Sequence, residues 1–243
     1  MRVEFRFQIK ELPIGYRLGI LSIIKEMIRL GSEQYYEEIF KKRKKDIKPF
    51  SYATYIHNLS IHHDKIYGDE LVLTVSSSSY EWFMHLINGS SKKKEFLYKN
   101  NRFLLISKRM LPSYTIKQPI VTFSTKSPLL LESKDKKPVL SNDSNFEKEL
   151  HYISSLIIEE LYNRKPYQPI RVLNTSMKKQ VLKENLHNDQ NELLYLTTNK
   201  GYMQLEGHPD DLQAIYENGV GYRRSLGLGL LDIKEVTDKE WSN

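Results

Sequence analysis

A glycine-rich segment near the C-terminus combines residue types that bind phosphate. It comprises Gly219, Gly221, Tyr222, Arg223, Arg224, Ser225, Gly227 and Gly229 together with three apolar residues. Glycine lets the backbone approach a ligand and adopt positive φ, successive free amides attract phosphate, and arginine adds charge-assisted hydrogen bonds. The segment predicts a phosphate-binding loop, although a turn that only lets two elements pack closely fits the same pattern.

Two common nucleotide-binding patterns do not fit this segment. A G-x-G-x-x-G fingerprint starting at Gly219 would need its third glycine at Arg224, and the segment precedes a predicted strand rather than a helix. No GxxxxGK[ST] sequence occurs in the chain. A dinucleotide or P-loop site is therefore not expected here.

A second candidate phosphate contact is a run of five consecutive cations, formed by Lys41, Lys42, Arg43, Lys44 and Lys45. Such a run cannot pack in a core and is either solvated or paired with a polyanion. The chain has 37 basic and 30 acidic residues, a net charge of +7, which favours polyanionic partners. Its 16 tyrosines add aromatic faces that can hold unpaired bases, although most are expected to pack in the structure.

Other functions lack the residues they need. There is no cysteine, which excludes disulfides and thiolate metal sites and favours a reducing cytoplasm. No apolar run approaches the ~20 residues of a membrane span, and the first ten residues alternate charged and apolar types, unlike a signal peptide. His62 and His63 are adjacent on a predicted strand and so point to opposite faces. We therefore expect no metal site, no cofactor and no membrane partner.

The elements that would position these residues form two similar halves. In the first, the predicted order is a strand at 2–10, helices at 16–30 and 32–40, strands at 50–56 and 69–76, a helix at 79–88 and hairpin strands at 95–98 and 103–108. In the second, it is strands at 120–123 and 129–132, a loop at 133–143, a helix at 146–162, strands at 170–175, 192–197 and 202–205, a helix at 208–218 and a strand at 228–236. These assignments follow from apolar periods of two and 3.6 residues.

The first half has the ferredoxin-like order of strand, helix, strand, strand, helix, strand, and the elements of the second half fit the same fold with an added hairpin. Prolines and polar residues over 112–119 interrupt the pattern, so we expect domains at residues 1–115 and 116–243. The predicted fold is α+β, with two tandem ferredoxin-like (RRM-like) domains, each an antiparallel sheet with helices on one face.

Several segments, in order, resemble the CRISPR-associated endoribonucleases that process precursor CRISPR RNA, members of the RAMP superfamily. Residues 225–229 (SLGLG) match the family's Ser-Leu-Gly-x-Gly entry into a strand. Residues 48–52 (KPFSY) resemble the segment that opens its second strand, and residues 119–124 and 127–129 resemble the strand pair that opens its second half. The resemblance covers nearly the whole chain.

The resemblance implies an antiviral defence enzyme that binds CRISPR repeat RNA and cuts it to release crRNA. In such enzymes the RNA's own 2′-hydroxyl attacks the adjacent phosphate and leaves a 2′,3′-cyclic phosphate and a 5′-hydroxyl, without a metal. Precursor crRNA is the implied partner, other CRISPR effector subunits are a further one, and the chain would act as a monomer or homodimer. The first domain would carry the catalytic residues and the second the glycine-rich loop.

Lys48 matches the family lysine that faces the scissile phosphate, so we expect it to be catalytic; the alternative is one more cation of the basic run. The family's general-base histidine lies just before that segment. Here the matching residues are Tyr35, Tyr36, Glu37 and Glu38. Three readings stay open: another group is the base, the site works by positioning, or the protein binds RNA without cutting well.

Two replacements for the histidine are available. His57 is the nearest one, and strand alternation puts it on the face of Tyr55, opposite Tyr52. A histidine titrates near neutrality and can serve as acid or base, but a structurally bonded histidine at a strand end fits equally. Tyr35 and Tyr36 are the second choice, since a tyrosine with a pKa near ~10 needs a nearby cation to act as a base.

Two other functions remain as hypotheses. One is a non-catalytic or weakly catalytic CRISPR-associated RNA-binding subunit of the same superfamily. The other is an unrelated basic ferredoxin-like protein that binds nucleotides or metal ions.

Overall fold

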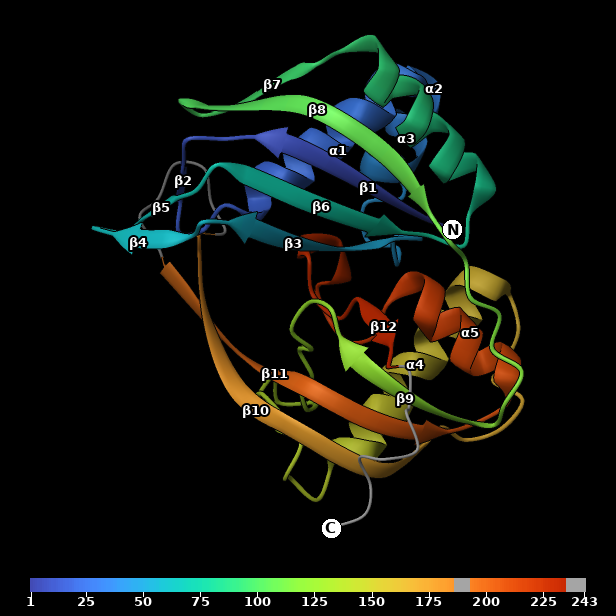
Figure 1. The fold of residues 1–243 in the computed structure, drawn as a ribbon. Coiled ribbons are helices and arrows are strands. Elements are labelled where there is room, and N and C mark those ends of the chain that lie inside the picture. The colour runs from blue at the N-terminus through green and yellow to red at the C-terminus, as the bar shows by residue number, and fades with distance from the viewer. Residues whose placement is uncertain (186–192, 235–243) are drawn as a thin grey trace.

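A computed structural model describes residues 1–185 and 193–234. Two antiparallel sheets form the centres of two halves, each with its helices packed on one face (Figure 1). The first half contains β1 (Arg2–Gln8), α1 (Arg17–Gly31), β3 (Ser51–His57), β6 (Glu70–Ser76), α3 (Tyr80–Lys92), β7 (Glu95–Tyr98) and β8 (Asn101–Leu111). The second half contains β9 (Ile120–Thr125), α4 (Phe146–Tyr162), β10 (Arg171–Asn185), β11 (Leu193–Glu206), α5 (Pro209–Asn218) and β12 (Leu231–Ile233).

The strand order identifies both halves as ferredoxin-like. The first sheet has the order β3-β6-β1-β8-β7 and the second the order β10-β11-β9-β12, and all their pairings are antiparallel. If the four principal strands of each half are numbered along the chain, both sheets read 2-3-1-4. The predicted tandem ferredoxin-like fold is confirmed.

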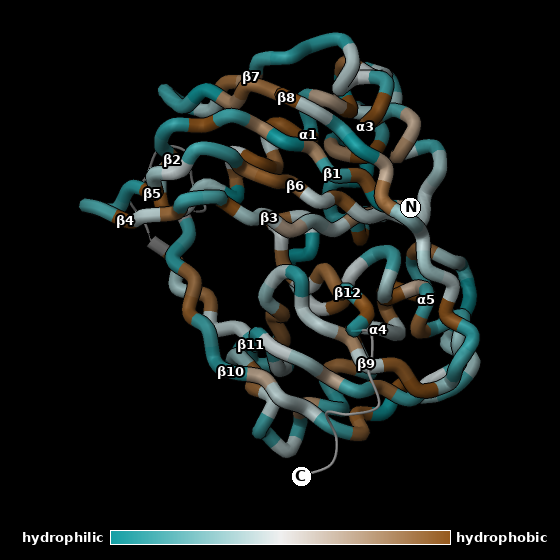
Figure 2. Tube along the Cα trace, in the orientation of Figure 1, coloured by the Kyte–Doolittle hydropathy of each residue, from teal (hydrophilic) through white to brown (hydrophobic). Residues whose placement is uncertain are grey.

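Alternating side chains build the first core, as the sequence predicts. Val3, Phe5 and Phe7 of β1 are fully buried, and they pack in one cluster with Ile24 and Met27 of α1. Figure 2 shows the hydrophobic positions of β1 and α1 within this half. Because one face of β1 is buried, the register of the whole sheet is fixed by this alternation.

The segment between α1 and β3 carries the basic run and differs in detail from the prediction. The predicted helix at 32–40 is α2 (Glu33–Tyr36) followed by a π-helix, η1 (Glu37–Lys42). Ser32 caps it as expected, since its hydroxyl accepts a hydrogen bond of 3.2 Å from the Tyr35 amide.

Three short strands, β2 (Glu11–Pro13), β4 (Ser60–His62) and β5 (Lys65–Tyr67), form a small separate sheet.

The second half differs from the prediction mainly in its strands. The predicted strands at 192–197 and 202–205 belong to one long strand, β11, which pairs with β10 along its length; residue 192 lies outside the described residues. The hydrophobic alternation stops at residues 198–201, so the sequence pattern predicts a break there. The backbone hydrogen bonds to the neighbouring strand do not depend on that alternation and continue through these residues. The predicted strand at 129–132 is reduced to isolated bridges. The strand predicted at 228–236 is β12, three residues long, and residues 235 and 236 lie outside the described range.

Each half has its own hydrophobic core, one drawn from residues 3–103 and the other from residues 116–231. This separation supports the boundary near residue 115, which we propose as the domain division. The halves meet through Arg2, only 5% exposed, whose guanidinium donates to the carbonyl oxygens of Tyr216 (2.9 Å) and Leu231 and to a carboxylate oxygen of Asp232 (3.1 Å).

The β10–β11 hairpin makes a second junction between the halves. Arg17 of α1 forms a largely buried ion pair with Glu184 of β10, and burial raises the pKa of the Glu184 carboxyl while the Arg17 charge opposes that rise. Lys183 pairs with Asp64 at 2.7 Å. No feature of the local sequence predicts these contacts, because each joins residues more than a hundred positions apart.

Candidate functional site

Lys48 lies in the segment that leads into β3, next to the buried Phe50. Its ammonium donates hydrogen bonds to the backbone carbonyl oxygens of Arg43 and, at 3.0 Å, Asp46. Partial burial lowers the pKa of the Lys48 ammonium below its usual value, an effect that the Asp46 charge opposes. The cation is thus held at the surface by carbonyl groups of its own loop, which a phosphate would have to replace.

The glycine-rich loop packs directly against the start of β3. Gly219 has φ 75°, and a Cβ on it would lie 2.6 Å from the Ser51 hydroxyl oxygen. A Cβ on Gly227, which also has φ 75°, would lie 2.4 Å from the Tyr52 ring. Close packing between the halves therefore requires glycine at both positions, which is the alternative that the sequence left open for this segment.

Arg224 joins this loop to Lys48. Its side chain is 6% exposed and donates to the carbonyl oxygens of Asn218 and, at 3.0 Å, Lys48. Burial lowers the pKa of the Arg224 guanidinium to about 10. The side chain is enclosed by protein carbonyl groups, so it connects the two halves instead of extending to the surface.

Arg223 has a different environment from its neighbour. Its backbone is left-handed, with φ 55°, and its side chain is half-buried. Within the described part of the chain, its guanidinium has no hydrogen-bond or ion-pair partner. The adjacent arginines that look equivalent in the sequence therefore divide into one buried link and one cation open to a ligand.

A cavity of about 230 Å³ separates the loop from the basic run. It is lined by Lys44, Lys45, Asp46, Ile47 and Lys48, by Ile153 and Ile157 of α4, and by residues 221–225. The glycine-rich loop and the basic run thus face one another, although Arg224 and Lys48, which are in contact, are 176 residues apart in the sequence. Phosphate oxygens placed here would meet several cations within one Debye length.

The basic run is only partly free for such a role. Lys41 pairs with Glu37 at 2.5 Å, Lys42 with Glu38 at 3.5 Å, and Arg43 with Asp46 at 2.7 Å. Lys44 and Lys45 are exposed and form no ion pair among the residues that the structure describes. These two lysines are therefore the members of the run that reach the cavity unpaired.

A second cavity, of about 320 Å³, is also lined by Lys48 and includes Tyr35. The Tyr35 ring packs on His85 with 4.6 Å between centroids, and burial raises the pKa of its hydroxyl to about 12. A hydroxyl with this pKa keeps its proton at neutral pH, so it suits proton donation better than proton removal. Ser79, Glu81 and Glu160 also line this cavity. They are far from Lys48 in the sequence, so no local pattern of residues predicts that they lie near it.

Tyr36 and His57 are not brought to Lys48. The Tyr36 ring packs beside that of Phe40, with 5.6 Å between centroids, and Tyr36 lines neither cavity. His57 follows the predicted alternation, with its ring 4.8 Å from that of Tyr55, and its Nε2 lies 3.5 Å from a Glu70 carboxylate oxygen. It ends a seven-residue strand that begins beside Lys48, which separates the two by roughly 20 Å.

No group of three or more His, Asp or Glu side chains in residues 1–185 and 193–234 is arranged to hold a metal ion. No helix within those ranges is long and apolar enough to span a bilayer.

Residues 110–233 match the family described as "CRISPR associated protein Cas6, C-terminal". No curated protein matches the chain.

Solved structures resemble the chain over nearly its full length. One, described as a Cas6-related gene from Pyrococcus furiosus, has a TM-score of 0.82 and 23% identity, over 97% of this chain and 98% of that one. A second, described as CRISPR associated protein Cas6, has a TM-score of 0.73 and 22% identity, over 97% and 99%. A third, described as an RAMP protein binding different RNA substrates, has a TM-score of 0.78 and 19% identity, over 97% and 100%. At these identities the likeness is one of fold.

Proposed function

Because this chain belongs to the Cas6 family of CRISPR-associated proteins, we propose that it binds CRISPR repeat RNA and cleaves it to release crRNA. The observation that carries the proposal is the contact between the two halves at Lys48. There the glycine-rich loop, Lys44, Lys45 and Lys48 line one cavity, and Arg224 bonds to the Lys48 carbonyl oxygen. A similar fold occurs in a protein described as binding different RNA substrates.

The proposed reaction is a metal-independent transesterification. The 2′-oxygen of the RNA loses its proton and forms a bond to the adjacent phosphorus, and the bond from phosphorus to the 5′-oxygen breaks. The 5′-oxygen takes up a proton, so the products are a 2′,3′-cyclic phosphate and a 5′-hydroxyl. The protein must neutralise the added negative charge on phosphorus and hold the reacting atoms in line.

Lys48 is the proposed cation at the scissile phosphate. Its ammonium now satisfies two carbonyl oxygens, and it would exchange one of them for a phosphate oxygen. Lys44, Lys45 and Arg223 would hold neighbouring phosphates of the strand, since each is unpaired among the described residues and lines the same cavity. Glycine amides and Ser225 would contact the backbone of the RNA from the loop side.

Arg224 is proposed as a positioning residue. Its buried guanidinium fixes the distance between the loop and Lys48, and displacement of either by even 1 Å is costly to an in-line reaction. Tyr35 is the proposed proton donor to the 5′-oxygen, because it lines a cavity together with Lys48 and its hydroxyl is protonated at neutral pH.

A second function is favoured by one specific observation. The stretch 33–38 has no histidine, and His57 lies at the opposite end of β3. A protein without a general base near Lys48 would bind repeat RNA and cut it slowly or not at all, as a CRISPR-associated RNA-binding subunit. Its residual rate of cleavage would then depend only on how the protein positions the RNA strand and neutralises the charge of the phosphate.

A denaturing gel of end-labelled repeat RNA incubated with the protein in EDTA separates the two functions. A single cut, with a 2′,3′-cyclic phosphate on the upstream product, supports the endoribonuclease. The control RNA carries a 2′-deoxy substitution at the cut position and should stay intact. Binding to repeat RNA in preference to scrambled RNA, without a cut, supports the subunit, and equal binding to both RNAs contradicts both functions.

A further inference from the structure

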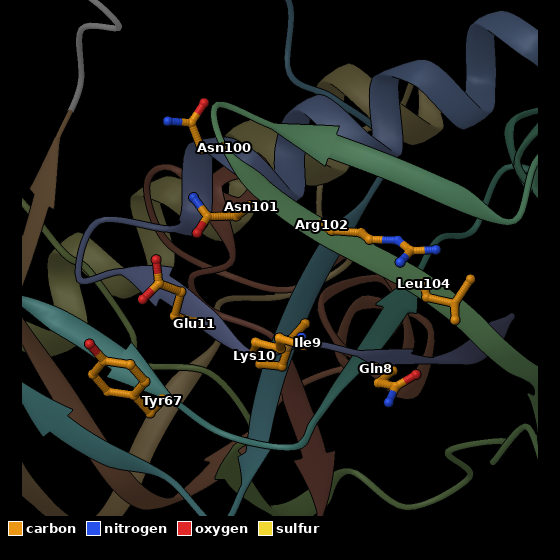
Figure 3. Close-up of a pocket in the computed structure, with 9 residues that line it drawn as sticks. All are labelled: Gln8, Ile9, Lys10, Glu11, Tyr67, Asn100, Asn101, Arg102 and Leu104. Carbon is orange, nitrogen blue, oxygen red and sulfur yellow. The ribbon is translucent and has the colours of Figure 1, made fainter.

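A cavity of about 540 Å³ lies at the far end of the first sheet from Lys48, and Figure 3 shows the side chains around it. It is lined by the end of β1 and the turn after it (residues 8–11), by Tyr67 of β5, and by Asn100, Asn101, Arg102 and Leu104 at the start of β8. In the sheet, Gln8 pairs with Glu70 and Leu104, whereas Arg2, at the other end of β1, pairs with Ser76. Six residues of strand separate these ends by roughly 20 Å.

The polar side chains around this cavity are of two kinds. Some are satisfied by protein neighbours: Glu11 pairs with Lys65 at 2.9 Å, and Arg102 with Glu95 at 2.8 Å. Others are not. Gln8, Lys10 and Asn100 are exposed, and none of their side chains has a hydrogen-bond or ion-pair partner in the part of the chain that the structure describes.

The side chains without protein partners match the edge of a nucleobase. A carboxamide presents a donor and an acceptor side by side, the arrangement that binds a base through two hydrogen bonds. Gln8 and Asn100 supply two carboxamides on opposite sides of the cavity, and Lys10 supplies a charge for a phosphate. Tyr67 is 37% exposed and offers a ring face on which a base can stack.

We propose that this cavity binds an unpaired base of the RNA strand whose scissile phosphate lies at Lys48. The inference rests on the proposed RNA substrate and adds a recognition site several nucleotides from the cut. The volume is sufficient for a whole nucleotide, since ligand pockets start near ~300 Å³. Base contacts, unlike phosphate contacts, carry sequence information, so this cavity contributes to the choice of repeat.

An abasic scan of the RNA, crossed with a variant of the cavity, tests the proposal. Repeat RNAs with a 2′-deoxy cut position are synthesised with one abasic nucleotide at each position in turn, and their binding is measured with the wild type and with Tyr67→Ala. With the wild type, removal of the recognised base should weaken binding about tenfold, the scale of one lost base stack. With Tyr67→Ala the effect at that position should become smaller, because the base has already lost its stacking partner.

A matched control is Tyr114→Ala, which removes an exposed tyrosine (46%) from the segment joining the halves. Its abasic profile should equal that of the wild type. Asn100→Ala is the second cavity variant and should couple to the same RNA position as Tyr67→Ala.

The proposal is overturned if the effects of Tyr67→Ala and of the abasic nucleotide add at every position. It is also overturned if Tyr114→Ala couples to the same abasic RNA position as Tyr67→Ala. A failure of the proposed function looks different, because the wild type would then bind unmodified repeat RNA no better than scrambled RNA, and the cavity would lose its RNA ligand as well.

Discussion

The guanidinium of Arg224 donates a 3.0 Å hydrogen bond to the backbone carbonyl oxygen of Lys48, across 176 residues of chain and between the two halves of the molecule. The same side chain bonds to Asn218, where α5 ends and the glycine-rich loop begins. One buried residue therefore fixes the loop against the cation proposed to act on the scissile phosphate.

Arg224→Ala should reduce both stability and cleavage. It leaves the buried carbonyl oxygen of Asn218 unsatisfied, at a cost of about 1–3 kcal/mol, and removes the partly buried hydrogen bond to Lys48, so thermal unfolding should shift to lower temperature. Cleavage should fall through displacement of Lys48. The test is single-turnover cleavage by Arg224→Ala, Lys48→Ala and the double variant at a temperature where all are folded. The double variant should be no slower than Lys48→Ala, and independent, additive losses would contradict a role through Lys48.

Arg223→Ala should weaken RNA binding without changing stability. Its guanidinium is unpaired among the described residues and lines the cavity beside Lys48, so its loss removes about one phosphate contact and lowers the salt slope of binding by about 1. Fluorescence titrations at several salt concentrations measure this slope. The control is Lys117→Ala, which removes an exposed cation from the segment between the halves. An equal change of slope in both variants would count against a specific contact at Arg223.

Lys48→Ala should slow single-turnover cleavage by about 100-fold or more while changing RNA affinity much less. The pH dependence gives a sharper test. Burial lowers the pKa of Lys48. As pH rises, Lys48 therefore loses its charge at a lower pH than an ordinary lysine does. The rate of the wild type relative to Lys48→Arg should therefore fall at alkaline pH, because arginine stays charged. A ratio that is flat with pH would show that the charge at position 48 does not act in the reaction.

Tyr35→Phe and His57→Ala separate the two candidates for proton transfer. Phenylalanine keeps the packing on His85 but removes the hydroxyl, so Tyr35→Phe should reduce the single-turnover rate by about 100-fold, the scale of one general acid. His57→Ala should leave the rate within about twofold, since roughly 20 Å of strand separates it from Lys48. The reverse result, a slow His57→Ala and an unchanged Tyr35→Phe, would assign proton transfer to the histidine and remove Tyr35 from the mechanism.

The sequence alone determined the fold class and the main elements. Apolar periods are local signals, and for this reason the helix over 146–162 and the repeated strand and helix order were predicted correctly. The resemblance carried by residues 48–52 and 225–229 also led to the family that the match over residues 110–233 confirms. Local patterning failed where backbone pairing continues through polar residues, as in β11.

Only the tertiary structure decided what the individual side chains of the site can do. Arg223 and Arg224 are adjacent, chemically identical and line the same cavity. The guanidinium of Arg223 has no protein partner among the described residues, whereas that of Arg224 is buried and bonded to the Lys48 carbonyl oxygen. Tyr35 and His57 were alternatives in the sequence, and the fold brings the first to Lys48 and keeps the second apart. Burial, pairing and proximity depend on contacts between distant segments, and these arise only when both halves pack together, so no local pattern of residues encodes them.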